Sequence, residues 1–224
     1  RCAVPALCAG NVVILKHSNQ VPGCSLEMQQ LFITAGFPKD VFTSVLIESK
    51  HVQQLIPFVQ AVSLTGSVNA GRSVAEQAGK HLKKIVLELG GTDPFIVLDD
   101  ADLSLTCQNA IKSRFINSGQ SCIAAKRFIV TQKKSKEFTQ YVIAAARELV
   151  VGNPLSPKTQ VGPLANLNQL KNLEQQVKRT AHQGARIETG GKRMKRKGYF
   201  YKPTIVTKVK RTMPVMEEEL FGPV

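Results

Sequence analysis

The chain has 224 residues, of which 43% are hydrophobic and 6% aromatic, and its formal net charge is +14 at pH 7. This length suits one large domain or two small ones with a real hydrophobic core. No window approaches the roughly 18 uninterrupted apolar residues of a membrane-spanning helix, so we expect no membrane association. Five cysteines without a C-x-x-C pair argue against a disulfide scaffold or a metal site, and they favour a reducing, cytoplasmic setting.

Much of the positive charge is concentrated in residues 192–197, between Gly191 and Gly198. A basic run flanked by glycines is most simply a solvated hairpin or loop. A nucleic-acid-binding module would interleave aromatic side chains with the charges. Since aromatic residues are few, we expect no nucleic-acid partner, and the basic binding module is retained only as a competing interpretation.

The first part of the chain alternates between two patterns. Short apolar runs predict strands, and apolar residues at helical spacing predict helices. The expected strands cover residues 11–16, 41–47, 59–65 and 84–89, and the expected helices cover 22–35 and 70–79. This alternation is typical of a parallel α/β sheet.

The alternation continues after Gly90-Gly91, the expected seam between two domains. Strands are predicted over residues 94–98, 127–130 and 185–188, and helices from a cap within 99–102 to Phe115, over 135–150 with Ser135 as its cap, and over 167–177. The C-terminal residues 214–224 hold three consecutive glutamates, which indicate a helix end or a turn. The domains are therefore expected to cover residues 1–89 and 90–224.

A single cysteine, Cys122, follows a Gly-Gln-Ser run at the end of a helix-like segment. Its alternative role is that of a small buried hydrophobe. The polar, glycine-containing approach and the nearby Lys126 and Arg127 favour a reactive thiolate instead. Cys122 is thus a candidate nucleophile.

The candidate partner of this thiol is Glu88, which ends an apolar run just before two glycines. A carboxylate in such a place is either neutralised by Lys83 or Lys84 or serves as a general base. A thiol and a carboxylate, each beside flexible backbone, are the parts needed for covalent thioester chemistry.

Two further segments are suited to a phosphate or a ribose. Residues 65–71 follow a strand and open a helix, where glycine allows backbone to approach a phosphate, although it also allows tight packing. Lys16 closes a strand, at the kind of edge where open α/β sheets bind ligands, although it also suits a plain surface position.

Taken in order, five segments resemble motifs of the aldehyde dehydrogenase superfamily. They are residues 11–16, 64–71, 87–91, 119–122 and 218–224. The stretch 117–130 is most similar to bacterial succinate-semialdehyde dehydrogenases of the NADP-using type. The resemblance implies an α/β fold with a Rossmann-type parallel-sheet cofactor domain, incomplete and covering 1–89, and an α/β catalytic domain over 90–224.

The resemblance also implies residue roles. Cys122 is the expected nucleophile, and Glu88 is the expected base that activates water against the thioester. The expected contacts with NADP or NAD are Lys16, Ser18, Asn19, Gly66, Ser67, Gly71, Glu219 and Phe221. Many NAD-preferring members carry a glutamate where this chain has Asn19, so we expect NADP to be accepted at least as well as NAD. Arg114 either meets a substrate carboxylate or is a helix-surface charge.

By the same resemblance the chain is expected to be an internal fragment, about half of a protomer, of a homo-oligomeric enzyme acting on a small aldehyde. The isolated chain is expected to be poorly stable and inactive. A CoA-acylating aldehyde dehydrogenase usually lacks the base, so Glu88 favours hydrolysis over that alternative. An inactive structural paralogue is a further alternative.

Overall fold

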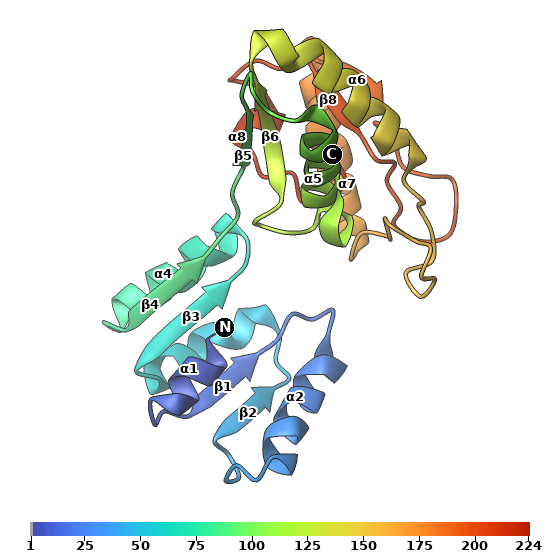
Figure 1. The fold of residues 1–224 in the computed structure, drawn as a ribbon. Helices are drawn as coiled ribbons and strands as arrows, with labels where there is room; N and C mark the ends of the chain where they lie inside the picture. The colour runs from blue at the N-terminus through green and yellow to red at the C-terminus, as the bar shows by residue number, and fades with distance from the viewer. Residues whose placement is uncertain (1) are drawn as a thin grey trace. The chain divides into compact units, whose positions relative to one another are not determined.

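The computed structural model describes residues 2–224, and the chain divides into two compact units, Arg1–Leu89 (unit 1) and Gly90–Val224 (unit 2). Unit 1 runs from blue to green in Figure 1, and unit 2 from green to red. Both units combine helices with short sheets, so the predicted α/β fold is confirmed. No helix in residues 2–224 has the length and apolar content needed to cross a membrane.

Unit 1 contains two parallel strand pairs. Its elements are α1 (Ala3–Cys8), β1 (Val13–Lys16), α2 (Pro22–Thr34), β2 (Phe42–Val45), η1 (Ser49–His51), α3 (Val52–Leu55), η2 (Ile56–Phe58), β3 (Ala61–Thr65), α4 (Val68–Lys80) and β4 (Lys84–Glu88). In β1–β2 Lys16 lies opposite Val45, and in β3–β4 Thr65 lies opposite Glu88. Since parallel strands end at the same edge, each pair places its C-terminal residues together.

The strand pairs of unit 1 are thinly covered. The buried hydrophobic residues within 2–89 are Phe42, Ile56 and Ala78. Leu31 on α2 is 67% exposed and Val86 on β4 is 58% exposed. Parallel sheets normally have both faces covered, so apolar burial inside unit 1 contributes little to its stability.

Unit 2 has one parallel and one antiparallel strand pair. Its elements are β5 (Asp93–Val97), α5 (Leu103–Phe115), η3 (Ile116–Gly119), β6 (Ala125–Val130), α6 (Gln132–Glu148), α7 (Leu167–His182), β7 (Arg186–Thr189), β8 (Ile205–Thr207) and α8 (Pro214–Glu217). β5 pairs with β6 in parallel, and β7 pairs with β8 in antiparallel orientation. α5 and α6 lie beside the β5–β6 pair in Figure 1.

Two apolar clusters hold unit 2 together. The first joins β5, α5 and α6 through Val97, Ala110 and Phe138, and it fixes the helix that leads to the cysteine. The second joins α7 to the C-terminal segment through Leu173 and Met213. The core therefore positions both ends of the region around Cys122.

Most expected elements are present, and their ends differ by a few residues. Asp102 caps α5, because its Oδ1 accepts a hydrogen bond from the backbone N–H of Leu105 at 3.0 Å. The predicted cap at Ser135 is wrong, because α6 begins at Gln132 with Thr131 as its N-cap. α1 and β8 were not predicted from the sequence.

The basic run 192–197 forms an exposed loop, as predicted, and it is anchored at both ends. Arg193 forms a two-pronged ion pair with Glu174 of α7. The Arg196 guanidinium lies 4.2 Å from the centroid of the Phe200 ring. Part of the local charge is thus committed within the unit.

We expect Glu174→Gln to lower the melting temperature of the full chain at neutral pH and to have a smaller effect in acid. The hydrogen bond and charge of Arg193 hold the pKa of Glu174 below its ordinary value. The stabilisation is therefore present above the pKa of the unfolded state and is lost as the pH falls through the folded-state value. Thermal melts of both proteins across this range measure the difference, with the exposed Glu217→Gln as control. An equal difference in acid would contradict the assignment.

Candidate active site

Cys122 lies in the turn that connects η3 to β6. Just before it, Asn117, Ser118 and Gly119 take φ angles of 48°, 58° and 74°. This left-handed region is uncommon for residues with a side chain, and such strain persists only where surrounding contacts enforce it. Two of the three residues carry side chains, so the turn has to be held from outside.

Polar side chains hold the strained turn against residues 162–165. Ser118 Oγ accepts a hydrogen bond from the backbone N–H of Gly162 at 2.8 Å. Gln120 Oε1 accepts one from the backbone N–H of Ala165 at 2.9 Å. The position of Cys122 is therefore set by contacts with a segment about 40 residues later in the chain.

The thiol of Cys122 is free and partly exposed. Cys107 differs from Cys122, because it is buried in the cluster that joins β5, α5 and α6, and this burial raises the pKa of its thiol. The alternative of a small buried hydrophobe thus describes Cys107 and not Cys122. The nucleophilic role of Cys122 stays a prediction.

Arg114 lies inside unit 2 with a relative exposure of 1%. Its Nη1 donates to the carbonyl oxygen of Ala125 at 3.1 Å, and its Nη2 donates to those of Gly119 at 2.7 Å and Gly222 at 2.8 Å. The alternative of a helix-surface charge is wrong. The predicted contact with a substrate carboxylate has no support in this geometry, because both Nη atoms already donate to backbone oxygens and the Nε atom is buried.

Lys126 is the second buried cation beside the turn. Its Nζ donates to the carbonyl oxygen of Cys122 at 2.8 Å and lies 3.7 Å from Glu219 Oε1. Burial is the main cause that lowers the pKa of Lys126, and Glu219 opposes it. Arg127, the other expected neighbour of the thiol, donates to the carbonyl oxygen of Thr92 at 2.7 Å instead.

The predicted cofactor residue Glu219 faces Lys126. The preceding glutamate, Glu218, points to another partner. Glu218 accepts hydrogen bonds from Arg179 of α7 at 2.7 Å. Glu219 also lies close to Gly90, where a Cβ atom would overlap its carboxylate. Phe221 follows as a partly buried residue.

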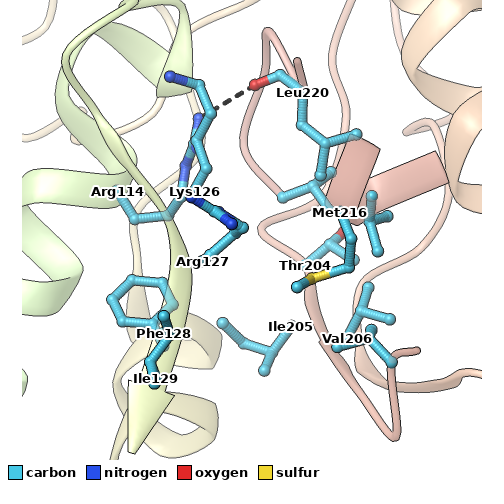
Figure 2. A pocket seen from close by; sticks show the side chains of 13 residues that line it. Arg114, Lys126, Arg127, Phe128, Ile129, Thr204, Ile205, Val206, Met216 and Leu220 are labelled. Atoms are coloured by element: carbon cyan, nitrogen blue, oxygen red, sulfur yellow. Dashed lines mark hydrogen bonds between the residues drawn. The ribbon is translucent and has the colours of Figure 1, made fainter. Parts of the chain in front are cut away.

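A cavity of about 140 Å³ lies between β6 and the C-terminal segment. Figure 2 shows Arg114 and Lys126 at one end of it and apolar side chains, among them Phe128 and Met216, along its walls. Cys122 does not line it. The cavity therefore lies behind the turn and is distinct from the surface that presents the thiol.

In unit 1 the predicted cofactor residues at the end of β1 meet one another. Lys16 Nζ donates to Asn19 Oδ1 and to Ser49 Oγ, each at 3.2 Å. Ser18 Oγ accepts a weak bond from the backbone N–H of Gln20 at 3.4 Å. Ser49 was not predicted from the sequence; the signal was its position shortly after β2, the strand paired with β1.

The segment 65–71 forms the start of α4, as expected. Ser67 is the N-cap of α4, and its Oγ accepts from the backbone N–H of Ala70 at 3.2 Å. The backbone N–H of Gly66 donates to the carbonyl oxygen of Glu88 at 3.0 Å. Gly71 is buried where a Cβ atom would press on the Leu89 side chain, which gives it a packing role.

Glu88 is exposed at the last position of β4. Within residues 2–224 it forms no ion pair, so the neutralisation by Lys83 or Lys84 is not observed. An exposed carboxylate at a strand end is free to act on a ligand. Its role as a base stays a prediction.

We expect Gly119→Ala to destabilise the full chain by roughly 1–3 kcal/mol, the usual cost of a strained backbone conformation. Residue 119 takes φ +74°, and a Cβ atom there would overlap the carbonyl oxygen of Gly222. Urea unfolding measures the effect. Gly162→Ala is the matched control, because its Cβ atom would meet only ordinary contacts at 3.6 Å. Equal stability of the two variants would show that the turn is not constrained as described.

Comparison with known proteins identifies the family of the chain. The aldehyde dehydrogenase family model matches residues 1–224. A succinate-semialdehyde dehydrogenase (NADP(+)) of Mycobacterium leprae is 46% identical over 226 residues, which cover 100% of this chain and 50% of the relative. The chain thus spans about half the length of the curated relatives it matches.

Two solved structures are similar over nearly the whole chain. That of lactaldehyde dehydrogenase from Escherichia coli has a TM-score of 0.96 at 39% identity, covering 100% of this chain and 48% of the other. That of succinate-semialdehyde dehydrogenase from Burkholderia pseudomallei has a TM-score of 0.94 at 38% identity, covering 99% and 47%. With the family match over its full length, the chain belongs to the aldehyde dehydrogenase family.

Proposed function

We propose that the protein containing this chain oxidises an aldehyde to the carboxylic acid, with NADP or NAD as hydride acceptor. The observation that carries the proposal is a free, partly exposed thiol on a strained and clamped turn, in a chain of this family. Succinate semialdehyde is the proposed substrate, because relatives at 46% identity are named for it and for NADP(+).

In the proposed reaction, the Cys122 thiolate attacks the aldehyde carbon and forms a thiohemiacetal. The backbone N–H of Cys122 is the proposed donor to the resulting oxyanion. NADP or NAD, when bound, would supply the acceptor for the hydride that this carbon loses with both electrons of its C–H bond. The product on Cys122 is then a thioester, which water must cleave to release the acid and restore the thiol.

Glu88 is the proposed base for this cleavage. It accepts a proton from water, whose oxygen then attacks the thioester carbon. The exposure of Glu88 and its freedom from ion pairs within residues 2–224 support this role.

Residues 1–89 are the proposed cofactor part and residues 90–224 the proposed catalytic part. The donors around Lys16 fit a nucleotide, because its ammonium donates to neutral oxygens of Asn19 and Ser49 and forms no ion pair within residues 2–224, so its charge remains for an anion. Gly66 and Ser67 at the start of α4 would approach the pyrophosphate. Glu219 would hold the nicotinamide ribose, with Phe221 beside it.

We also propose a homo-oligomeric, cytoplasmic enzyme without a nucleic-acid partner. The exposed apolar residues of unit 1 support a covered state in the whole protein. The ion pair of Arg193 with Glu174 supports the view that the basic loop is not a free nucleic-acid surface.

With succinate semialdehyde and NADP, the full-length Glu88→Gln variant is expected to form about one NADPH per active site in a burst and then turn over at least 10²-fold more slowly than wild type, since general-base catalysis contributes about 10²–10⁴-fold. Cys122→Ser should give no burst. Absorbance of NADPH after rapid mixing measures both, and butyraldehyde serves as the uncharged substrate of equal length.

The controls for this experiment are Glu76→Gln, an exposed carboxylate on α4, and Cys24→Ser, an exposed thiol. Both should turn over like wild type. Normal turnover of Glu88→Gln would remove the proposed base, and formation of acyl-CoA in the presence of CoA would favour the acylating alternative. Faster oxidation of butyraldehyde than of succinate semialdehyde would contradict the proposed substrate.

We expect the full-length protein to use NADP at least as efficiently as NAD, and Asn19→Glu to reverse this preference. A carboxylate beside Lys16 would repel the 2′-phosphate of NADP and compete for the ammonium. The ratio of kcat/KM for the two cofactors is measured in both proteins, with Asn19→Gln as the neutral control. A strong NAD preference of the wild type would contradict the expectation.

A further inference from the structure

The Lys126 ammonium is buried, and all of its hydrogen-bond donors have acceptors. Its side chain has 0% exposure. The Nζ atom donates to the carbonyl oxygens of Ser121 at 3.1 Å, Cys122 at 2.8 Å and Ala124 at 3.3 Å. An ammonium has three N–H donors, so all of them are directed at the turn that carries the thiol.

The charge of Lys126 has one carboxylate in contact, and this is Glu219. The separation of 3.7 Å is an ion pair without a hydrogen bond, and Glu219 Oε1 is buried without any hydrogen-bond partner. Since Glu218 is bound by Arg179 and Gln176, the carboxylate that faces Lys126 is fixed by the surrounding contacts. The cation therefore connects the turn with a segment almost 100 residues later.

Stability does not account for the pairing of Lys126 with Glu219. Burying a charge is costly, and a buried ion pair often contributes no more than apolar residues of similar volume. Arg114 lies close enough to add repulsion, since its charge contributes to the lowered pKa of Lys126. The best-attested benefit of such a pair is that it fixes the relative position of two segments.

We propose that Lys126 is a positioning residue that sets the distance between the Cys122 turn and the Glu219 carboxylate. This inference rests on the proposed function, in which Cys122 attacks the aldehyde and Glu219 holds the nicotinamide ribose. Lys126 then aligns the carbon that loses hydride with the ring that accepts it. Misplacement by about 1 Å is enough to cost about 10²-fold in rate.

The test uses full-length Glu88→Gln as the parent protein, because its slow thioester cleavage makes the NADPH burst visible, and adds Lys126→Met, Glu219→Gln or both. Lys126→Met should lower the burst rate constant about 10- to 100-fold and leave the burst amplitude within twofold of the parent. A merely structural role would lower the amplitude, because fewer sites would be intact. Lys178→Met, an exposed lysine of α7, is the control and should match the parent.

The double variant should be no more than about threefold slower than the slower single variant, because both changes break the same link. Multiplicative losses, or a normal rate constant in Lys126→Met, would overturn the proposal.

If Lys126→Met fails to fold, Lys126→Gln, which keeps two N–H donors, replaces it. If the parent shows no burst, the proposed function has failed. Lys126 is then judged by the iodoacetamide reaction of Cys122 relative to Cys24, and an unchanged ratio in Lys126→Met overturns its positioning role.

Discussion

Five backbone carbonyl oxygens of the turn around Cys122 turn toward the interior of unit 2 and need donors there. They belong to Gly119, Ser121, Cys122, Ala124 and Ala125. A buried polar group left without a partner costs about 1–3 kcal/mol, and two buried cations prevent this cost. Arg114 takes the carbonyls at the two ends of the turn, and Lys126 takes those between them. The same cations then reach Glu219 and the backbone of residues 220–222. The shape of the turn thus determines which distant segment lies against it.

Local sequence patterns predicted the elements that depend on local forces. Short apolar runs marked most strands, and the acidic residues before α5 marked its N-cap. The start of α6 was missed because residues 132–134 are polar and give no apolar periodicity, while Thr131 adjoins the preceding strand. β8 was missed because a three-residue strand after Pro203 exists only through its pairing with β7. Such elements depend on tertiary contacts that no short window contains.

The same division applies to the candidate site. Cys122 and Lys16 were recognisable because each stands at the end of an element and beside residues of a known motif. The environment of Arg114 was not, because its partner Gly222 lies 108 positions away and contributes only a backbone oxygen. Ser49 likewise meets Lys16 only because β1 and β2 pair in parallel. Residue type shows which chemistry is available, whereas pairing and packing decide which groups meet.

Lys16 and Lys126 show how burial divides one residue type between two tasks. Lys126 has no exposed side-chain surface. Its three N–H donors bind the turn and its charge pairs with Glu219, so it has no free donor for a ligand. Lys16 donates to neutral oxygens at a sheet edge and forms no ion pair within residues 2–224, so its charge remains available to an anion. The net charge of +14 therefore says little by itself about what the chain binds. What matters is the setting of each cation, and Lys16 combines an uncommitted charge with a strand end and neighbouring polar groups that suit a phosphate.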